Sequence, residues 1–210
     1  RNWYIWADPA PDGGPPNNWR SVFGGSAWEF DPATGQYYLH TFLKEQPDLN
    51  WRNPEVRAAM FDVLRFWFER GVDGFRIDAL RFLIKDEHLR NNPPNPDYTP
   101  DQPPFNELIP AYSADQYELH EIRAAMRHVT DAFGERVLIG EMYIPISRLV
   151  TYYGCRHERE LHFPFNFQLL LIPWTARHIA ATIDTYEGLL GPDDWPNWVL
   201  SNHDHPRVAT

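Results

Sequence analysis

The chain has 210 residues, a formal net charge of −10 at pH 7 and a sequence pI near 5.3. This length and the apolar content suffice for the core of one or two globular domains. The excess of acidic residues argues against nucleic acid or an anionic membrane surface as a partner, because phosphate groups are bound through clustered Lys and Arg. A neutral ligand fits this charge better.

No stretch approaches the roughly eighteen apolar residues of a membrane-spanning helix, so no membrane partner is predicted. Cys155 is the only cysteine, which excludes an internal disulfide and favours a reducing compartment. We therefore expect a cytoplasmic protein. Because the chain begins at Arg1 and stops at Thr210 beside a motif, we also expect it to be a piece of a longer protein, so the lack of a signal peptide in these residues carries no weight.

Residues 1–50 are rich in Trp, Pro, Gly and Asn and show no sustained hydrophobic period. This composition predicts an irregular subdomain with many turns. Its tryptophans could stack on sugar rings, but a small loop-rich lobe also needs large apolar side chains in its core, and we favour that interpretation. The four tryptophans are Trp3, Trp6, Trp19 and Trp28.

A helix is predicted from Asn53, a suitable N-cap, to Gly71, with Pro54 at the first helical position. Its apolar residues recur every three or four positions, at Val56, Met60, Val63 and Trp67.

Two further helices and four strands are predicted downstream. A capping box at Ser113 and Gln116 predicts a helix that ends at Gly134, and a third helix covers residues 176–190. Apolar runs typical of strands follow the three helices at residues 72–78, 137–141 and 198–204, and a fourth strand is predicted near residues 161–167.

This alternation of helices and strands predicts a parallel α/β sheet with right-handed crossovers. An open doubly wound sheet usually has a Gly-rich phosphate turn after its first strand, and the sequence lacks one, so we favour a (β/α)₈ TIM barrel. A complete barrel needs roughly 250 residues, so this chain would supply about half of one. The Pro-rich stretch at residues 91–112 is interpreted either as a wall or lid of the catalytic face or as a flexible loop.

Three of the predicted strands end on an acidic residue, at Asp78, Glu141 and Asp204. Parallel barrel strands open onto one face, so these carboxylates should converge there. A retaining glycosidase needs an ionised carboxylate and a protonated carboxyl group about 5 Å apart. Arg76 should keep Asp78 ionised, whereas the apolar run before Glu141 should raise its pKa as an acid catalyst requires. His203 would add a hydrogen-bond donor for sugar hydroxyls.

Each acid also has a purely structural interpretation, as a helix cap or as one partner of an ordinary ion pair. The coincidence of three such acids at strand ends weakens that interpretation. The sequence contains no Cys and His cluster with the spacing of metal ligands, no Gly-x-Ser-x-Gly elbow and no P-loop. We therefore predict no metal site in this chain.

Four ordered segments resemble the α-amylase superfamily, glycoside hydrolase family 13. Residues 74–79 (GFRIDA), 140–143 (GEMY) and 201–204 (SNHD) resemble its second, third and fourth signature segments. Residues 46–50 (QPDLN) are similar to the marker that closes the inserted B domain in its α-glucosidase and oligo-1,6-glucosidase branch. The family's first signature segment has no counterpart in the chain.

The resemblance implies a role for each site residue. It implies Asp78 as the nucleophile, Glu141 as the acid/base and Asp204 as the transition-state stabiliser. The residues implied to bind substrate are Arg76, His203, Phe165 and Arg207. It further implies that residues 1–50 are part of the B domain and that residues 51–210 are a partial catalytic barrel of about strands 4 to 7, with residues 163–166 on the sixth strand.

The function implied is a retaining, exo-acting α-glucosidase on short oligosaccharides, working by double displacement and with some transglucosylation. Ala79 after the nucleophile implies a preference for α-1,4 linkages. An isomerising relative, such as trehalose synthase or sucrose isomerase, and a non-catalytic homologue associated with a transporter are the alternatives. No cofactor is expected, calcium would bind outside this chain, the oligomeric state stays open, and residues 1–210 alone are expected to be inactive.

Overall fold

The computed structural model describes residues 2–155, 158–205 and 207. The chain divides into two compact units, which are described separately. The first unit comprises residues 1–60 and 81–119, and the second comprises residues 61–80 and 120–210. No helix in these described ranges is long and apolar enough to cross a membrane.

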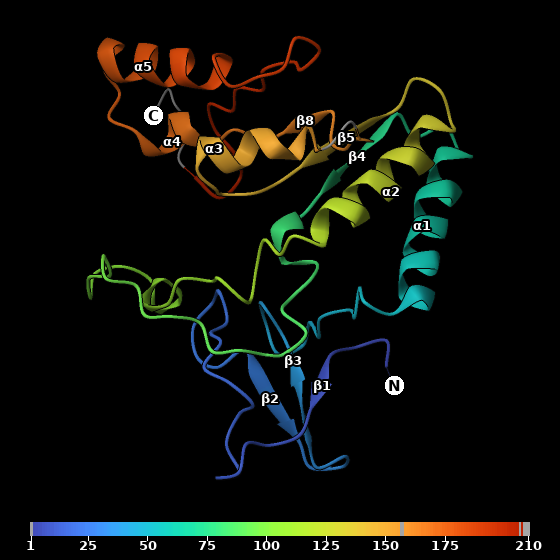
Figure 1. Cartoon of the computed structure of the whole chain (residues 1–210), viewed down its shortest axis with the longest axis vertical. Coiled ribbons are helices and arrows are strands. Elements are labelled where there is room, and N and C mark those ends of the chain that lie inside the picture. Colours follow the sequence, from blue (N-terminus) through green and yellow to red (C-terminus); the bar gives the residue numbers. More distant parts are fainter. Residues whose placement is uncertain (1, 156–157, 206, 208–210) are drawn as a thin grey trace. The chain divides into compact units, whose positions relative to one another are not determined.

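A small antiparallel sheet organises the first unit (Figure 1). Its strands are β1 (Trp6–Ala7), β2 (Trp28–Asp31) and β3 (Gln36–Leu39), in the order β1-β3-β2. Trp19 and Trp28 stack at 6.0 Å between ring centroids, and both are almost fully buried. The prediction of a core role is confirmed for these two tryptophans, whereas Trp3 is exposed. The sequence did not predict the sheet, because its strands have only two to four residues.

A buried ion pair ties the two parts of the first unit together. The Lys85 ammonium donates to the carboxylate of Asp48, within the QPDLN segment, and to the carbonyl oxygen of Phe82. The other oxygen of Asp48 accepts the backbone N–H of Thr41 at 2.9 Å. The side chain of Lys85 is 4% exposed. Loss of either partner would leave an uncompensated buried charge.

We expect Lys85→Met to lower the free energy of unfolding by about 3–5 kcal/mol, since Asp48 would lose its buried counter-ion. Arg65→Met is the control, because the Arg65–Asp62 pair is exposed and should contribute only about 0–1 kcal/mol. Urea unfolding of the natural protein that carries this chain measures both. Equal losses in the two variants would contradict this account.

The Pro-rich stretch 91–112 is held by its own hydrogen bonds. It contains a 3₁₀ turn, Pro104–Glu107, and a bridge between Pro94 and Leu108. The buried Asn92 accepts the N–H of Tyr112 at 2.9 Å and donates to the hydroxyl of Ser113 at 2.8 Å. These contacts indicate an ordered segment and not a flexible loop.

Helix α1 (Pro54–Phe68) begins as predicted, because the side-chain oxygen of Asn53 accepts the N–H of Glu55 at 2.9 Å. Its predicted apolar face is only partly right. Val56, Leu64 and Phe68 are buried, whereas Val63 and Trp67 are more than 40% exposed. The buried side chains follow an i, i+4 stripe, because Phe68 packs edge-on against Phe75 of strand β4.

Helix α2 (Leu119–Asp131) begins six residues after Ser113, so the predicted capping box is wrong. Asp115 has a φ of 51°, which a right-handed helix cannot contain. The amide of Gln116 instead donates to the carbonyl oxygen of Ala111 at 2.8 Å. Leu119, Ile122, Met126 and Val129 are buried, at the spacing of three and four residues that is typical of an amphipathic helix.

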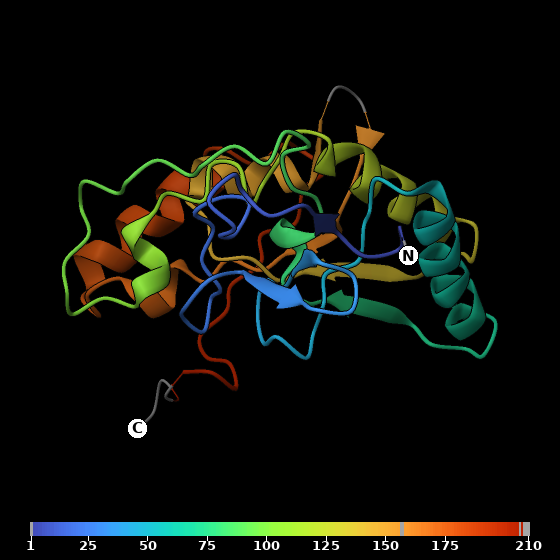
Figure 2. The ribbon, with the colours of Figure 1, turned by 90° about the horizontal axis from the view of Figure 1, so that it is seen from below.

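A parallel sheet organises the second unit. Strands β4 (Gly74–Ile77), β5 (Val137–Gly140) and β8 (Phe163–Pro164) occur in the order β4-β5-β8 and run in one direction (Figure 2). Three of the four predicted strands are therefore confirmed.

The remaining elements are β6 (Gly154–Cys155), β7 (Glu158–Arg159), η1 (Leu80–Phe82), α3 (Ile146–Leu149), η3 (Val150–Tyr152), α4 (Gln168–Leu171) and α5 (Ala176–Glu187).

The predicted strand at residues 198–204 does not form. Strand β8 has only two residues, and its second residue is Pro164, which has no N–H for a further ladder. Val199 makes a single backbone hydrogen bond to the carbonyl oxygen of Asn166, at 3.3 Å. Other contacts must therefore hold the segment that carries Asp204.

His162 links strands β5 and β8 through its ring. Its Nδ1 accepts the N–H of the buried Leu138 at 3.0 Å, so that nitrogen must be unprotonated. Burial, followed by the charge of Arg127, lowers the pKa of His162. The folded protein thus binds this proton more weakly than the unfolded chain. The stability from His162 is fully present above the unfolded pKa of about 6.5 and is lost as the pH falls through the lowered folded value.

We expect His162→Phe to reduce stability by roughly 1–3 kcal/mol at pH 7.5, because the N–H of Leu138 loses its acceptor. The variant should also lose less stability than the wild type between pH 7.5 and pH 5.5. His128→Gln, at an exposed position of α2, is the control and should keep the wild-type pH dependence. Urea unfolding at the two pH values measures this, and an unchanged slope for His162→Phe would contradict it.

Candidate active site

Two acids lie side by side at the carboxyl end of the parallel sheet. Asp78 directly follows β4 and Glu141 directly follows β5, and Ile77 pairs with Gly140 in the register. The N–H of Glu141 donates to the carbonyl oxygen of Ile77 at 3.0 Å, which fixes the second acid beside the first. This is the edge at which parallel strands present catalytic side chains.

The packing at this edge leaves little room for a side chain at Gly140. A Cβ at this position would lie 2.4 Å from Leu161, 2.7 Å from Met142 and 2.9 Å from Leu80, which is closer than side chains can approach. With no side chain at position 140, strand β5 ends among three apolar side chains. Glu141 follows directly and therefore leaves the strand in apolar surroundings.

Arg76 contacts both acids. Its guanidinium lies 2.9 Å from an oxygen of Asp78 and 2.6 Å from an oxygen of Glu141. The prediction that Arg76 keeps Asp78 ionised is therefore incomplete, because its guanidinium contacts both carboxyl groups. The position of Arg76 does not distinguish the nucleophile from the acid catalyst.

Solvent exposure separates the two acids. The side chain of Asp78 is 75% exposed, and that of Glu141 is 10% exposed. Burial raises the pKa of Glu141, and a hydrogen bond with Asp78 raises it further, although Arg76 acts in the opposite direction. A desolvated carboxyl group beside a solvated one is the usual arrangement of an acid catalyst and a nucleophile.

The backbone after the first acid is constrained. Ala79 has a φ of 47°, and its N–H points to Glu141 with a distance of 3.5 Å to the nearer side-chain oxygen. Leu80 donates to the carbonyl oxygen of Glu141 at 3.2 Å. A β-branched residue at the position of Ala79 would be strained, because its Cβ substituents disfavour positive φ.

Aromatic side chains follow the carboxyl ends of strands β5 and β8. Tyr143 stacks on the buried Phe167, with 4.2 Å between ring centroids and 11° between planes. Phe165, predicted to bind substrate, packs against Phe167 at 5.5 Å, and its N–H donates to the carbonyl oxygen of Gly140 at 2.9 Å. Phe165 is thus attached to the end of strand β5.

The remaining predicted residues lie on the segment after α5. His203 and Asp204 are both exposed and lie 3.6 Å apart, and Arg207 donates to the hydroxyl of Ser201 at 3.2 Å. The structure brings Asp78, Arg76 and Glu141 into direct contact.

The contact that reaches the Asp204 segment was not predicted. The side-chain amide of Asn202 donates to the hydroxyl of Tyr143 at 2.7 Å. Both residues lie inside the signature segments, but their pairing depends on three-dimensional placement. The one sequence signal for a site role of Tyr143 was its position two residues after Glu141.

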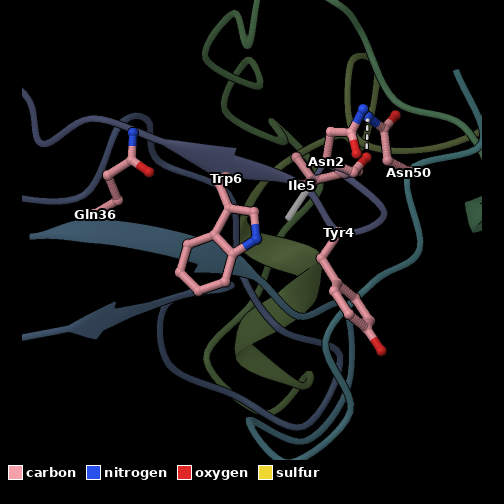
Figure 3. Close-up of a pocket in the computed structure, with 6 residues that line it drawn as sticks. All are labelled: Asn2, Tyr4, Ile5, Trp6, Gln36 and Asn50. Atoms are coloured by element: carbon pink, nitrogen blue, oxygen red, sulfur yellow. Dashed lines mark hydrogen bonds between the residues drawn. The ribbon is translucent and has the colours of Figure 1, made fainter. Parts of the chain in front are cut away.

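No group of three His, Cys, Asp or Glu residues that could hold a metal ion occurs within the described ranges. A hollow of about 420 Å³ lies in the first unit (Figure 3). It is lined by Asn2, Tyr4, Ile5, Trp6, Gln36 and Asn50. Its lining contains no carboxylate, whereas Asp78 and Glu141 are both residues of the second unit.

Comparisons with known proteins identify the family of this chain. The family model of the alpha amylase catalytic domain matches residues 1–210. A probable alpha-glucosidase of Rhizobium meliloti (strain 1021) is 40% identical over 98% of this chain and 39% of its own length. The human amino acid transporter heavy chain SLC3A1 is 36% identical over 100% of this chain and 32% of its own length.

A solved structure is also similar. The alpha-glucosyl transfer enzyme XgtA has 39% sequence identity and a TM-score of 0.88, over 97% of this chain and 39% of the other. The chain thus spans between about a third and two fifths of the proteins that it matches. The family model and this likeness indicate a (β/α)₈ barrel fold. The chain belongs to the α-amylase family and is part of its catalytic domain.

Proposed function

We propose that the natural protein carrying this chain is a retaining, exo-acting α-glucosidase on short α-linked glucosides. The observation that carries the proposal is the contact between Asp78 and Glu141, which share a hydrogen bond and both contact Arg76, together with the raised pKa of the buried Glu141. Carboxyl groups this close fit a retaining enzyme, because an inverting enzyme needs roughly 6.5–9.5 Å between them for a water molecule.

In the first step, Asp78 attacks the anomeric carbon and forms a glycosyl ester while the bond to the leaving oxygen breaks. Glu141 donates its proton to that oxygen, so the leaving sugar departs as a neutral alcohol. In the second step, the Glu141 carboxylate takes a proton from water, and the water oxygen attacks the anomeric carbon. Asp78 is released as a carboxylate and Glu141 regains its proton.

The further site roles are part of the proposal. Asp204 would stabilise the transition state, and Arg76, His203, Phe165 and Arg207 would bind the substrate. No cofactor or metal is required in this chain, and a neutral oligosaccharide is the proposed partner. Residues 1–50 would belong to an inserted B domain and residues 51–210 to about strands 4 to 7 of the barrel, in a cytoplasmic protein.

The product profile on maltose, isomaltose, sucrose and trehalose tests this function. Glucose released from maltose with retained anomeric configuration is the expected result, with a preference for the α-1,4 bond because of Ala79. Conversion of sucrose or maltose into an isomer would favour the isomerising alternative. No turnover of any of the four sugars would favour a non-catalytic homologue, which the match to a transporter heavy chain makes a specific alternative.

A further inference from the structure

Asn202 bridges the two halves of the proposed site. Its side-chain nitrogen donates to the hydroxyl of Tyr143 at 2.7 Å, and its side-chain oxygen accepts the backbone N–H of Asp204 at 3.0 Å. One side chain therefore contacts both the segment after Glu141 and the residue that carries the third acid.

The sheet contributes little to holding this segment. No strand forms at residues 198–204 of the described chain, and the backbone bond from Val199 to Asn166 lies five residues before Asp204. An exposed acid on an irregular segment has no fixed direction of its own. Its position must come from side-chain contacts such as the one that Asn202 makes with Tyr143.

Tyr143 is itself held firmly. Its ring stacks in parallel on Phe167, which is 2% exposed, so the hydroxyl has a defined direction. Burial raises the pKa of Tyr143, the hydrogen bond from Asn202 acts in the opposite direction, and the charges of Glu141 and Asp204 raise the pKa further, so the hydroxyl stays neutral at ordinary pH. A neutral, rigid hydroxyl is a suitable acceptor for the amide of Asn202.

We propose that Tyr143 and Asn202 are positioning residues, which hold Asp204 in its orientation toward the sugar through their mutual hydrogen bond. This inference rests on the proposed function, because it assumes that Asp204 acts on the substrate. Tyr143 and Asn202 need not touch the reacting atoms. A displacement of a catalytic group by about 1 Å lowers the rate by roughly 100-fold, so a single positioning contact has a measurable effect.

The test uses Tyr143→Phe, which keeps the stacked ring and removes only the hydroxyl. In the natural protein that carries this chain, kcat/KM on maltose should fall roughly 10- to 100-fold. In an Asp204→Asn background, Tyr143→Phe should cause almost no additional loss, because it acts through Asp204. Tyr38→Phe is the control with the same chemical change. It removes a hydroxyl that donates to the carbonyl oxygen of Lys44 at 2.9 Å within the first unit, and it should change kcat/KM less than twofold.

A second measurement does not depend on activity. Amide hydrogen exchange at Asp204 should become faster in Tyr143→Phe and stay unchanged in Tyr38→Phe, because the N–H of Asp204 bonds to Asn202. Unchanged exchange at Asp204, or losses in kcat/KM that multiply between Tyr143→Phe and Asp204→Asn, would overturn the inference. A wild type that is inactive on every glucoside would overturn the proposed function instead, and the exchange rates would still decide whether Tyr143 holds this segment.

Discussion

Asp78→Asn should abolish the turnover of every α-glucoside, by roughly 10⁴-fold or more, however good the leaving group is. The carboxamide cannot attack the anomeric carbon, so no glycosyl-enzyme can form. The side chain is 75% exposed and contacts Arg76, so the substitution should not disturb the core. Rates on maltose and on α-glucosyl fluoride, measured with the natural protein that carries this chain, should fall together.

Asp73→Asn is the matched control for this variant. Asp73 immediately precedes strand β4, its side chain is 95% exposed, and it lies 3.6 Å from Arg136. The same chemical change at that position should alter kcat/KM by less than about twofold. Substantial turnover of glucosyl fluoride by Asp78→Asn would mean that another group is the nucleophile.

The positions of Asp78 and Glu141 could be predicted because a buried parallel strand is recognised from a short local run of apolar residues. Residues 137–140 form a short apolar run, and the acid that follows must leave the sheet at its carboxyl end. Neighbouring parallel strands open on one side, so two such acids had to lie close together. The register between Ile77 and Gly140 agrees with that reasoning.

Other features depend on contacts that no local pattern records. Helix α2 could not begin at the predicted capping box, because Asp115 adopts a positive φ. The apolar run before Asp204 resembled a strand, but its neighbour β8 ends at Pro164 and offers no ladder. Arg76 alternates with Asp78 along the strand, which predicted their ion pair, but its contact with Glu141 arises only once β4 and β5 are paired.

The raised pKa of Glu141 leads to the second large effect, which concerns the leaving group. Glu141→Gln keeps the shape of the side chain and leaves Asp78 in place, and it removes only proton donation, worth roughly 10²–10⁴-fold. The loss should be severe on maltose, whose leaving alcohol must be protonated. It should be much smaller for formation of the covalent intermediate from α-glucosyl fluoride, since fluoride departs without a proton.

Breakdown of that intermediate should then become slow, because Glu141 also activates the incoming water. The glycosyl-enzyme should accumulate, and an anion such as azide, which needs no general base, should restore turnover. Mass spectrometry of Glu141→Gln mixed with α-glucosyl fluoride should locate the sugar on Asp78. An adduct on another residue would show that Asp78 is not the nucleophile, since only the nucleophile carries the sugar. Equal losses on maltose and the fluoride would show that Glu141 is not the acid, since only loss of the acid catalyst distinguishes the two leaving groups.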